Sequence, residues 1–279
     1  MANDLVLQGT QLTRQHATTL SAMTAASAIE VKPHSIRLKN ASRSDEVKAY
    51  CERERIDFGY VEAGRRLADF RLVAMDMDST LIAIECIDEI ADLQGIKPEV
   101  AAITASAMRG EIDFPESLRR RVALLAGLDE NALQRVYDER LRLSPGAERL
   151  FSELQAAHVR TLLVSGGFDF FTGRLKARLG IDYTLSNRLE VSDGKLTGRV
   201  SGPIVDGALK AARLRELTGE LGVSREQAIA LGDGANDLPM LAEAGVSIAF
   251  HAKPVVRERC TYCFDHVGLD GLVELFPPD

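Results

Sequence analysis

Four continuous apolar runs constrain the fold of this 279-residue chain more than any other feature of its sequence. They are RLVAM at 71–75, RTLLVSGG at 160–167, QAIALGDG at 227–234 and GVSIAF at 245–250. Runs of this kind are typical of strands buried on both faces, as in a parallel sheet that is covered by helices. Because segments with helical spacing separate the runs, the sequence predicts an α/β fold with a doubly wound, Rossmann-like parallel sheet.

Two interruptions of this pattern stand out. Residues 86–143 show no strand pattern but four stretches with helical spacing, which predicts a helical insertion. Open α/β sheets bind ligands outside the carboxyl ends of their strands, so we expect this insertion to cover that edge as a cap. At 188–200, alternating segments flank Asp193 and Gly194, which predicts a small β-hairpin.

The first 70 residues predict a separate, small α/β unit. Strand and helix patterns alternate as DLVLQG, QLTRQHATTLSAMTAAS, HSIRLKN, SRSDEVKAYCERERI and DFGYVE, followed by a linker at 63–70. The unit carries no cluster of reactive groups and weakly resembles small ligand-binding modules of amino-acid enzymes, so its role stays open. The predicted domains are 1–70 for this appendage, 71–85 with 144–279 for the core, and 86–143 for the cap.

Composition excludes several classes of protein. Thirty-four Lys and Arg against 41 Asp and Glu give a net charge of −7, which argues against a nucleic-acid binder. No apolar run is long enough to span a bilayer, and the N-terminus shows no signal-peptide pattern. Four cysteines do not make a disulfide framework, and the pair Cys260 and Cys263 lacks the partners of a zinc site. We therefore expect a cytoplasmic protein with reduced thiols.

Two carboxylates follow the first apolar run with one residue between them. Asp76 and Asp78 would face the same side of the strand end, about 6.6 Å of rise apart, with Met77 turned away. A phosphoryl group fits such a gap, with one carboxylate attacking it while the other transfers protons. The paired charge also attracts a divalent cation, and Mg²⁺ prefers oxygen ligands. Ser79 and Thr80 would supply hydroxyl and backbone N–H groups at the turn.

Polar groups recur where the later runs end. The Ser-Gly-Gly turn at 165–167 would let backbone N–H groups approach an anion at a helix N-terminus. Lys210, near the start of a predicted helix, is a compact counter-charge for phosphate. Taken singly, each of these features fits a solvated turn, a helix cap or a surface lysine. The turn at 232–238 carries more polar groups than a helix cap needs: Asp233, Asn236 and Asp237.

Taken together, these motifs carry a family resemblance. D-x-D-S-T, S-G-G, a lysine and G-D-G-x-N-D, in this order at strand ends, resemble the haloacid dehalogenase superfamily of phosphatases. The strings MDSTLIAIECIDEIA, DFPESLRRRVALL, SGGFDFF, NRLEVSDGKLTG and GDGANDLPML resemble, within it, the enzymes that hydrolyse phosphoserine. The resemblance covers about residues 71–276. It implies a haloacid dehalogenase-type core and Mg²⁺-dependent hydrolysis of phosphoserine, the last step of serine biosynthesis.

The resemblance also implies a role for each matching residue. Asp76 would attack phosphorus and become an aspartyl-phosphate, while Asp78 would protonate the leaving seryl oxygen and then deprotonate the attacking water. Asp76, the backbone carbonyl of Asp78 and Asp233 would hold Mg²⁺. The phosphoryl oxygens would be held by Ser165 and Lys210, with the backbone of Gly166 and with Asn236 completing the pocket, and Asp237 would orient Lys210 or metal-bound water.

Substrate specificity is expected from the cap. The resemblance assigns the substrate's ammonium to Glu85 and its carboxylate to Arg121, whose planar fork suits a two-bond grip. The arginines at 119 and 120 are near alternatives that the residues alone leave open. Met108 and Phe114 match residues that close over the substrate, although ordinary packing of a helical insertion would explain them as well.

Other functions remain as alternatives. A phosphoacceptor signalling module also phosphorylates a strand-end aspartate, but it needs neither Asp78 nor a cap. A phosphotransferase that uses phosphoserine, or a phosphatase for another small phosphate ester, would share every motif. A non-catalytic binding protein on this fold would not need the intact set of acids. A homodimer is compatible with the sequence, which offers no signal for or against it.

Overall fold

The computed structural model describes residues 2–278 and contains two sheets. The larger has seven strands in the order β11-β10-β9-β5-β6-β7-β8, parallel except for β8. The four expected apolar runs supply β5, β6, β9 and β10, so the prediction of an α/β parallel sheet is confirmed. Its strands are β5 (Leu72–Met75), β6 (Arg160–Phe168), β7 (Tyr183–Ser192), β8 (Lys195–Ser201), β9 (Ala228–Gly232), β10 (Val246–Phe250) and β11 (Tyr262–Phe264).

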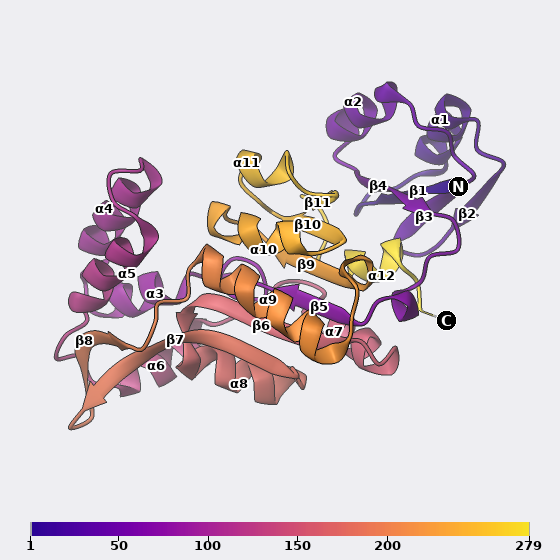
Figure 1. The fold of residues 1–279 in the computed structure, drawn as a ribbon. Helices are drawn as coiled ribbons and strands as arrows, with labels where there is room; N and C mark the ends of the chain where they lie inside the picture. The colour runs from indigo at the N-terminus through magenta and orange to yellow at the C-terminus, as the bar shows by residue number, and fades with distance from the viewer. Residues whose placement is uncertain (1, 279) are drawn as a thin grey trace.

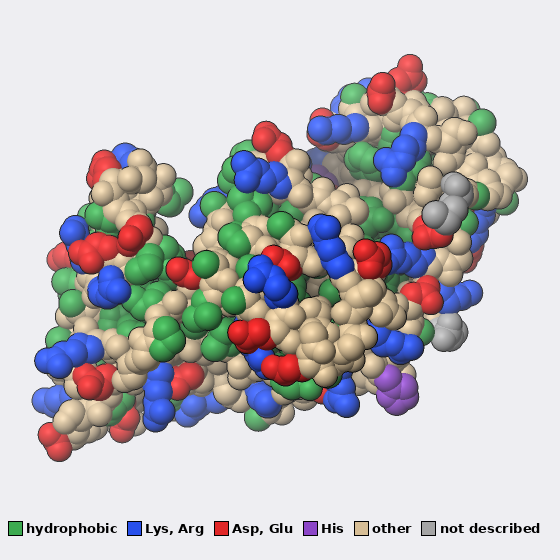
Figure 2. Space-filling model, viewed as in Figure 1, with side chains coloured by type: hydrophobic (Ala, Val, Ile, Leu, Met, Phe, Trp, Pro, Cys, Tyr) green, Lys and Arg blue, Asp and Glu red, His purple; other side chains and the backbone are tan. Residues whose placement is uncertain are grey.

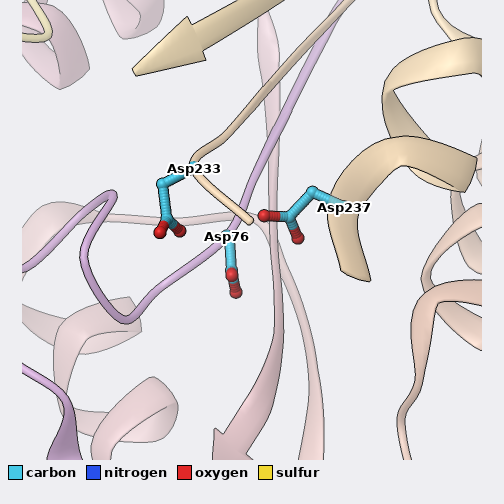
Figure 3. Close-up of side chains that lie close together, drawn as sticks. All are labelled: Asp76, Asp233 and Asp237. Carbon is cyan, nitrogen blue, oxygen red and sulfur yellow. The ribbon is translucent and has the colours of Figure 1, made fainter. Parts of the chain in front are cut away.

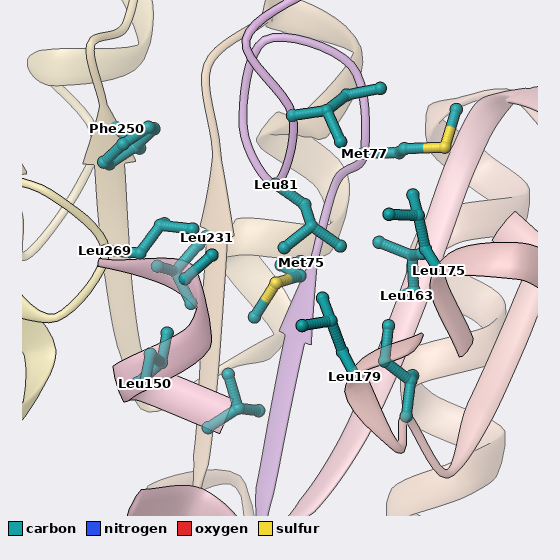
Figure 4. Close-up of a cluster of buried hydrophobic side chains, with 14 of the residues drawn as sticks. Met75, Met77, Leu81, Leu150, Leu163, Leu175, Leu179, Leu231, Phe250 and Leu269 are labelled. Atoms are coloured by element: carbon teal, nitrogen blue, oxygen red, sulfur yellow. The ribbon is translucent and has the colours of Figure 1, made fainter. Parts of the chain in front are cut away.

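Helices cover both faces of this sheet (Figure 1). Val73 and Met75 of β5 pack on one face with residues of α7, α8 and α12, while Leu72 and Ala74 pack on the other with α9, α10 and α11. Figure 4 shows part of the first layer, in which Met75 lies between the leucines of neighbouring strands and helices. The helices are α7 (Ala147–Ala156), α8 (Asp169–Leu179), α9 (Gly207–Leu221), α10 (Leu238–Glu243), α11 (Pro254–Arg257) and α12 (Gly271–Leu275), with short 3-10 turns at Arg225–Gln227 and Ala235–Asp237.

Between β5 and β6 lies the expected helical insertion, α3 (Cys86–Leu93), α4 (Lys97–Met108), α5 (Phe114–Ala123) and α6 (Asn131–Arg135), which continues as a π-helix at Val136–Arg140. Asp113 caps α5 by accepting a hydrogen bond from the backbone N–H of Glu116. The β7–β8 hairpin turns at Asp193 and Gly194, both with positive φ, as a two-residue loop requires. This hairpin packs against the insertion, because Leu196 exchanges backbone hydrogen bonds with residues 127 and 128.

The N-terminal unit forms the second sheet, with four antiparallel strands in the order β2-β3-β1-β4. Every predicted strand and helix is present, but the sequence interpretation missed β2. This edge strand has every residue exposed and therefore no alternation of buried and polar positions. The elements are β1 (Asn3–Gln8), α1 (Arg14–Thr24), β2 (Ala28–Val31), β3 (Ser35–Lys39), α2 (Asp45–Glu54) and β4 (Asp57–Glu62), and the linker holds a 3-10 turn at Leu67–Asp69.

Buried polar contacts fix the N-terminal unit to the C-terminal segment of the core. The guanidinium of Arg37 donates to the backbone carbonyls of Glu274 and Leu275, at 3.0 and 2.8 Å. Ser35 donates to the Glu274 carboxylate at 2.6 Å, and Oδ2 of Asp57 accepts three backbone N–H groups from residues 265–267. The unit therefore sits at one end of the large sheet, and α4 and α5 lie at the opposite end (Figure 1).

Candidate active site

A cavity of about 610 Å³ lies between the carboxyl edge of the sheet and the helical insertion. In the space-filling view this region is hollowed and hydrophobic side chains surround it (Figure 2). Most of the site residues expected from the sequence line the cavity, whereas Lys210, Asp237, Ser79 and Thr80 lie behind its wall. The lining residues are Asp76, Asp78, Glu85, Met108, Phe114, Arg121, Ser165, Gly166, Asp233 and Asn236. The sheet edge and the insertion thus bring residues that are up to 160 positions apart to one place, 76 and 236 being the extremes.

Lys210 lies beneath the cavity and is fully buried. Its Nζ is 2.8 Å from Oδ1 of Asp76 and 2.7 Å from Oδ1 of Asp237. Burial alone would lower the pKa of Lys210, but the charges of Asp237 and Asp76 outweigh it, so its pKa is raised above the ordinary value. The lysine is therefore a fixed positive charge directly behind Asp76.

Asp76 follows β5 directly and is almost fully buried. Its Oδ1 accepts hydrogen bonds from Lys210 and from the backbone N–H of Met77, the latter at 2.7 Å. Among the described residues, none donates a hydrogen bond to Oδ2. One oxygen of this carboxylate is thus held in place, and the other is free to react.

Asp78 lines the same cavity two residues further on. Burial and the nearby charge of Glu85 raise the pKa of its carboxyl group to about 7, although hydrogen bonds from Cys86 act in the opposite direction. The backbone N–H of Cys86, at the start of α3, donates to Oδ1 of Asp78 at 3.0 Å. A carboxyl group that titrates near neutrality suits an acid that gives up a proton and takes one back.

Two further carboxylates, of Asp233 and Asp237, lie beside Asp76 at the sheet edge (Figure 3). One oxygen each of Asp76, Asp233 and Asp237 lies within 4.8 Å of the others, and burial with the Asp237 charge raises the pKa of Asp233 to about 6. Lys210 compensates only part of this negative charge. A cluster of oxygen donors with surplus negative charge fits a hard divalent cation.

The Ser-Gly-Gly segment forms an irregular stretch of β6 rather than a loop after it. The register of β6 against β7 shifts between Val164 and Phe168, and α8 begins only at Asp169. The Ser165 hydroxyl accepts from the N–H of Gly167 at 2.8 Å, while Asn187 donates to the carbonyl of Gly166 at 2.7 Å. This shape turns the small residues toward the cavity.

The cap wall of the cavity carries opposite charges. Arg121 on α5 is half-buried and faces the carboxylates of Asp88 and Glu85. Burial lowers the pKa of its guanidinium, and these two charges oppose that shift. Its neighbours Arg119 and Arg120 are exposed and pair with Glu116 instead, so they do not line the cavity. Of the three arginines that the sequence left open, geometry places only the last one at the site.

Ser79 and Thr80 supply hydroxyls at the turn after Asp78, as expected from the sequence. The hydroxyls of Ser79 and Thr80 do not point into the cavity but bind carboxylates: Ser79 donates to Glu85 at 2.7 Å and Thr80 to Asp233 at 3.4 Å. Sequence reasoning missed Asn187, which supports Gly166, and Asp88, which lies one helical turn after Glu85. Glu85 directly precedes α3, and its spacing of three residues from Asp88 could have indicated Asp88, but nothing in the sequence indicated Asn187.

The fold and the site define a class: an α/β enzyme of phosphoryl transfer with an acid pair at the edge of a parallel sheet and a helical cap. Residues 73–242 match the family model of haloacid dehalogenase-like hydrolases. The chain is 59% identical to a phosphoserine phosphatase of Polaromonas sp. over 215 residues, which are 75% of this chain and 91% of the relative.

Two solved structures cover nearly the whole chain. A haloacid dehalogenase-family hydrolase of Salmonella enterica serovar Typhi is 34% identical, with a TM-score of 0.90 over 99% of this chain and 98% of that chain. A probable phosphoserine phosphatase of Vibrio cholerae is 37% identical, with a TM-score of 0.86 over 98% of this chain and 86% of that chain. The chain therefore belongs to the haloacid dehalogenase-like hydrolase family, and its N-terminal unit lies within the region that both structures match.

Proposed function

We propose that this hydrolase cleaves O-phosphoserine into serine and inorganic phosphate through a phosphoryl-Asp76 intermediate. One observation carries the proposal: a single cavity has acids on its core wall, with Lys210 directly behind Asp76, and Glu85 and Arg121 on its cap wall. Phosphoserine carries a phosphate at one end and an ammonium and a carboxylate at the other. Its charges match the two walls, because Glu85 would bind the ammonium and Arg121 the carboxylate.

The reaction proceeds in two displacements. Oδ2 of Asp76 forms a bond to phosphorus while the bond from phosphorus to the seryl oxygen breaks, and Asp78 gives its proton to that oxygen. Water then attacks phosphorus, its proton passes to Asp78, and the bond from Asp76 to phosphorus breaks to release phosphate. Asp78 returns to its protonated form, so one residue serves both steps.

Positioning and charge account for the stabilisation of both steps. The ammonium of Lys210 reduces the repulsion between Asp76 and an incoming phosphate dianion. Ser165, Asn236 and the backbone of Gly166 would hold phosphoryl oxygens, and Asp237 keeps Lys210 in place. Asp76, Asp233 and the backbone carbonyl of Asp78 would hold Mg²⁺, which would neutralise phosphoryl charge when bound.

The remaining parts of the proposal concern the cap and the setting. Met108, whose side chain is 69% exposed at the end of α4, and Phe114 would close over the bound substrate. The domains would divide as residues 1–70, 71–85 with 144–279, and 86–143.

We also propose a cytoplasmic location, a role as the last step of serine biosynthesis, and a homodimer that sedimentation would test. No helix within residues 2–278 is long and apolar enough to cross a membrane.

A phosphate-release assay tests the function directly. The purified protein is given a panel of phosphate esters, including phosphoserine, phosphothreonine, a phosphosugar and p-nitrophenyl phosphate, with Mg²⁺ or after chelation. We expect the highest kcat/KM for phosphoserine and loss of activity on chelation that Mg²⁺ restores. A higher kcat/KM for an ester without an amino-acid end would contradict the substrate, and full activity after exhaustive chelation would contradict the metal.

A further inference from the structure

The turn after Asp78 holds a serine in a backbone conformation that side chains rarely adopt. Ser79 has φ of 56°, in the left-handed region that favours glycine. Its backbone N–H donates to the carbonyl of Ile84 at 3.2 Å, and its hydroxyl donates to Oε1 of Glu85 at 2.7 Å. Glycine would relieve the backbone but would remove the hydroxyl, so the feature that serine adds here is its hydrogen bond to Glu85.

Ser79 acts behind the cavity wall. Glu85 lines the cavity and Ser79 does not, so the hydroxyl reaches the site only through the Glu85 carboxylate. Glu85 itself is exposed and has no ion pair among residues 2–278. A long, exposed glutamate without such an anchor would sample several rotamers and lose side-chain entropy on binding a ligand. The bond to Oε1 restricts this freedom and leaves Oε2 without a hydrogen-bond partner among the described residues.

The same turn also holds the proposed acid. The N–H of Cys86 donates to Oδ1 of Asp78 at 3.0 Å. Hydrogen bonds therefore link Asp78 to Cys86 and Ser79 to Glu85. The group that would protonate the seryl oxygen and the group that would bind the ammonium are thereby tied across one short turn. In phosphoserine that oxygen and the nitrogen lie on adjacent carbons, so a fixed spacing between the two groups matters.

We infer that Ser79 is a positioning residue that orients Glu85 toward the substrate's ammonium and so contributes to selection of an amino-acid phosphate. The inference rests on the proposed function, in which Glu85 binds that ammonium. It assigns the serine hydroxyl of the D-x-D-S-T motif, that of Ser79, to substrate selection rather than to phosphate binding. Discrimination between an ester with an amino group and one without it is therefore the property that should depend on Ser79.

The test compares two substrates in matched variants. Ser79→Gly keeps the positive φ but removes the donor, and Ser79→Asn tolerates this φ while it keeps a donor. The readout is kcat/KM for phosphoserine divided by kcat/KM for p-nitrophenyl phosphate. We expect Ser79→Gly to lower this ratio about tenfold, mainly through KM for phosphoserine, and Ser79→Asn to restore part of it. An unchanged ratio in folded Ser79→Gly overturns the inference, as does an equal loss for both substrates.

A double-mutant cycle shows whether Ser79 acts through Glu85. Glu85→Gln should lower the ratio, and adding Ser79→Gly to it should change the ratio no further. If the double variant lowers the ratio by the product of the two single effects, Ser79 acts independently of Glu85 and the positioning role is overturned. If the wild-type protein does not prefer phosphoserine, or if Glu85→Gln leaves the ratio unchanged, the proposed recognition of the ammonium fails and the inference falls with it. If the wild-type protein prefers phosphoserine and Glu85→Gln lowers the ratio, but Ser79→Gly leaves it unchanged, only the inference about Ser79 fails.

Discussion

Nζ of Lys210 lies 2.8 Å from Oδ1 of Asp76, and neither side chain is more than 7% exposed. The same ammonium is 2.7 Å from Asp237, so one buried positive charge separates two buried carboxylates. Breaking a buried ion pair by removing one partner leaves uncompensated charge, which is strongly destabilising. Lys210 thus contributes to the stability of the sheet edge as well as to the chemistry that we propose for Asp76.

Replacing Lys210 by Met should therefore affect stability as well as activity. The free energy of unfolding should fall by about 3 kcal/mol without metal, because Asp76 and Asp237 would face each other unpaired. Mg²⁺ should restore part of this loss, since a cation at the acid cluster replaces some of the missing charge. Thermal unfolding with and without Mg²⁺ measures both effects. Lys253→Met, an exposed lysine of the same cavity, is the control, and equal stability of both variants would contradict this account.

Arg121 tests the carboxylate end of the substrate. Arg121→Lys keeps the charge but loses the planar fork. A hydrogen bond to a charged group contributes roughly 1.5–3 kcal/mol, so kcat/KM for phosphoserine should fall about ten- to a hundredfold. The loss for p-nitrophenyl phosphate, which has no carboxylate, should be small. Arg120→Lys is the matched control because Arg120 pairs with Glu116 outside the cavity. A ratio of the two efficiencies that matches wild type would exclude Arg121 as the anchor.

Glu274 predicts how stability depends on pH. Burial would raise its pKa, but the hydrogen bonds from Ser35 and Arg149 outweigh it and hold the pKa below its ordinary value. A carboxyl group with a lowered pKa stabilises the fold above its unfolded pKa of about 4.3, and this contribution disappears as pH falls through the folded pKa. The difference in Tm between wild type and Glu274→Gln should therefore be a few degrees at pH 7 and should shrink below about pH 4.

Measured Tm values across that pH range decide this prediction. Because Ser35 belongs to the N-terminal unit and Arg149 to α7, the same experiment reports on how the unit is attached to the core. Glu148→Gln, on the exposed face of α7, serves as the control for a surface charge. A Tm difference that does not shrink as pH falls from 7 to well below 4 would show that the Glu274 charge does not stabilise this contact.

The central strands could be predicted because each is an apolar run long enough to be recognised. The elements that were missed lack this signal: β2 is exposed throughout, and β11 has only three residues. The Asp193–Gly194 turn could be predicted because both residues suit positive φ. An element of the fold could therefore be predicted when its own residues form a buried apolar run or a characteristic turn.

The site was predictable where its residues lie in a compact motif, as Asp76, Asp78 and Asp233 do. Contacts between distant segments left no local signal. Asn187 holds the carbonyl of Gly166 across 21 residues, and only the structure places it there. The choice of Arg121 over its neighbours likewise depends on which face of α5 meets the core, because one helical turn contains all three arginines.

The most direct measurement of the central claim is capture of the phosphoryl-enzyme. The protein is mixed with phosphoserine and Mg²⁺, quenched with acid during turnover and digested, and its peptides are analysed by mass spectrometry. The account predicts a phosphoryl group on the peptide that carries Asp76, and none in folded Asp76→Asn protein, which should release no phosphate. Rapid phosphate release without any protein-bound phosphoryl group, or a phosphoryl group on another residue, would contradict it.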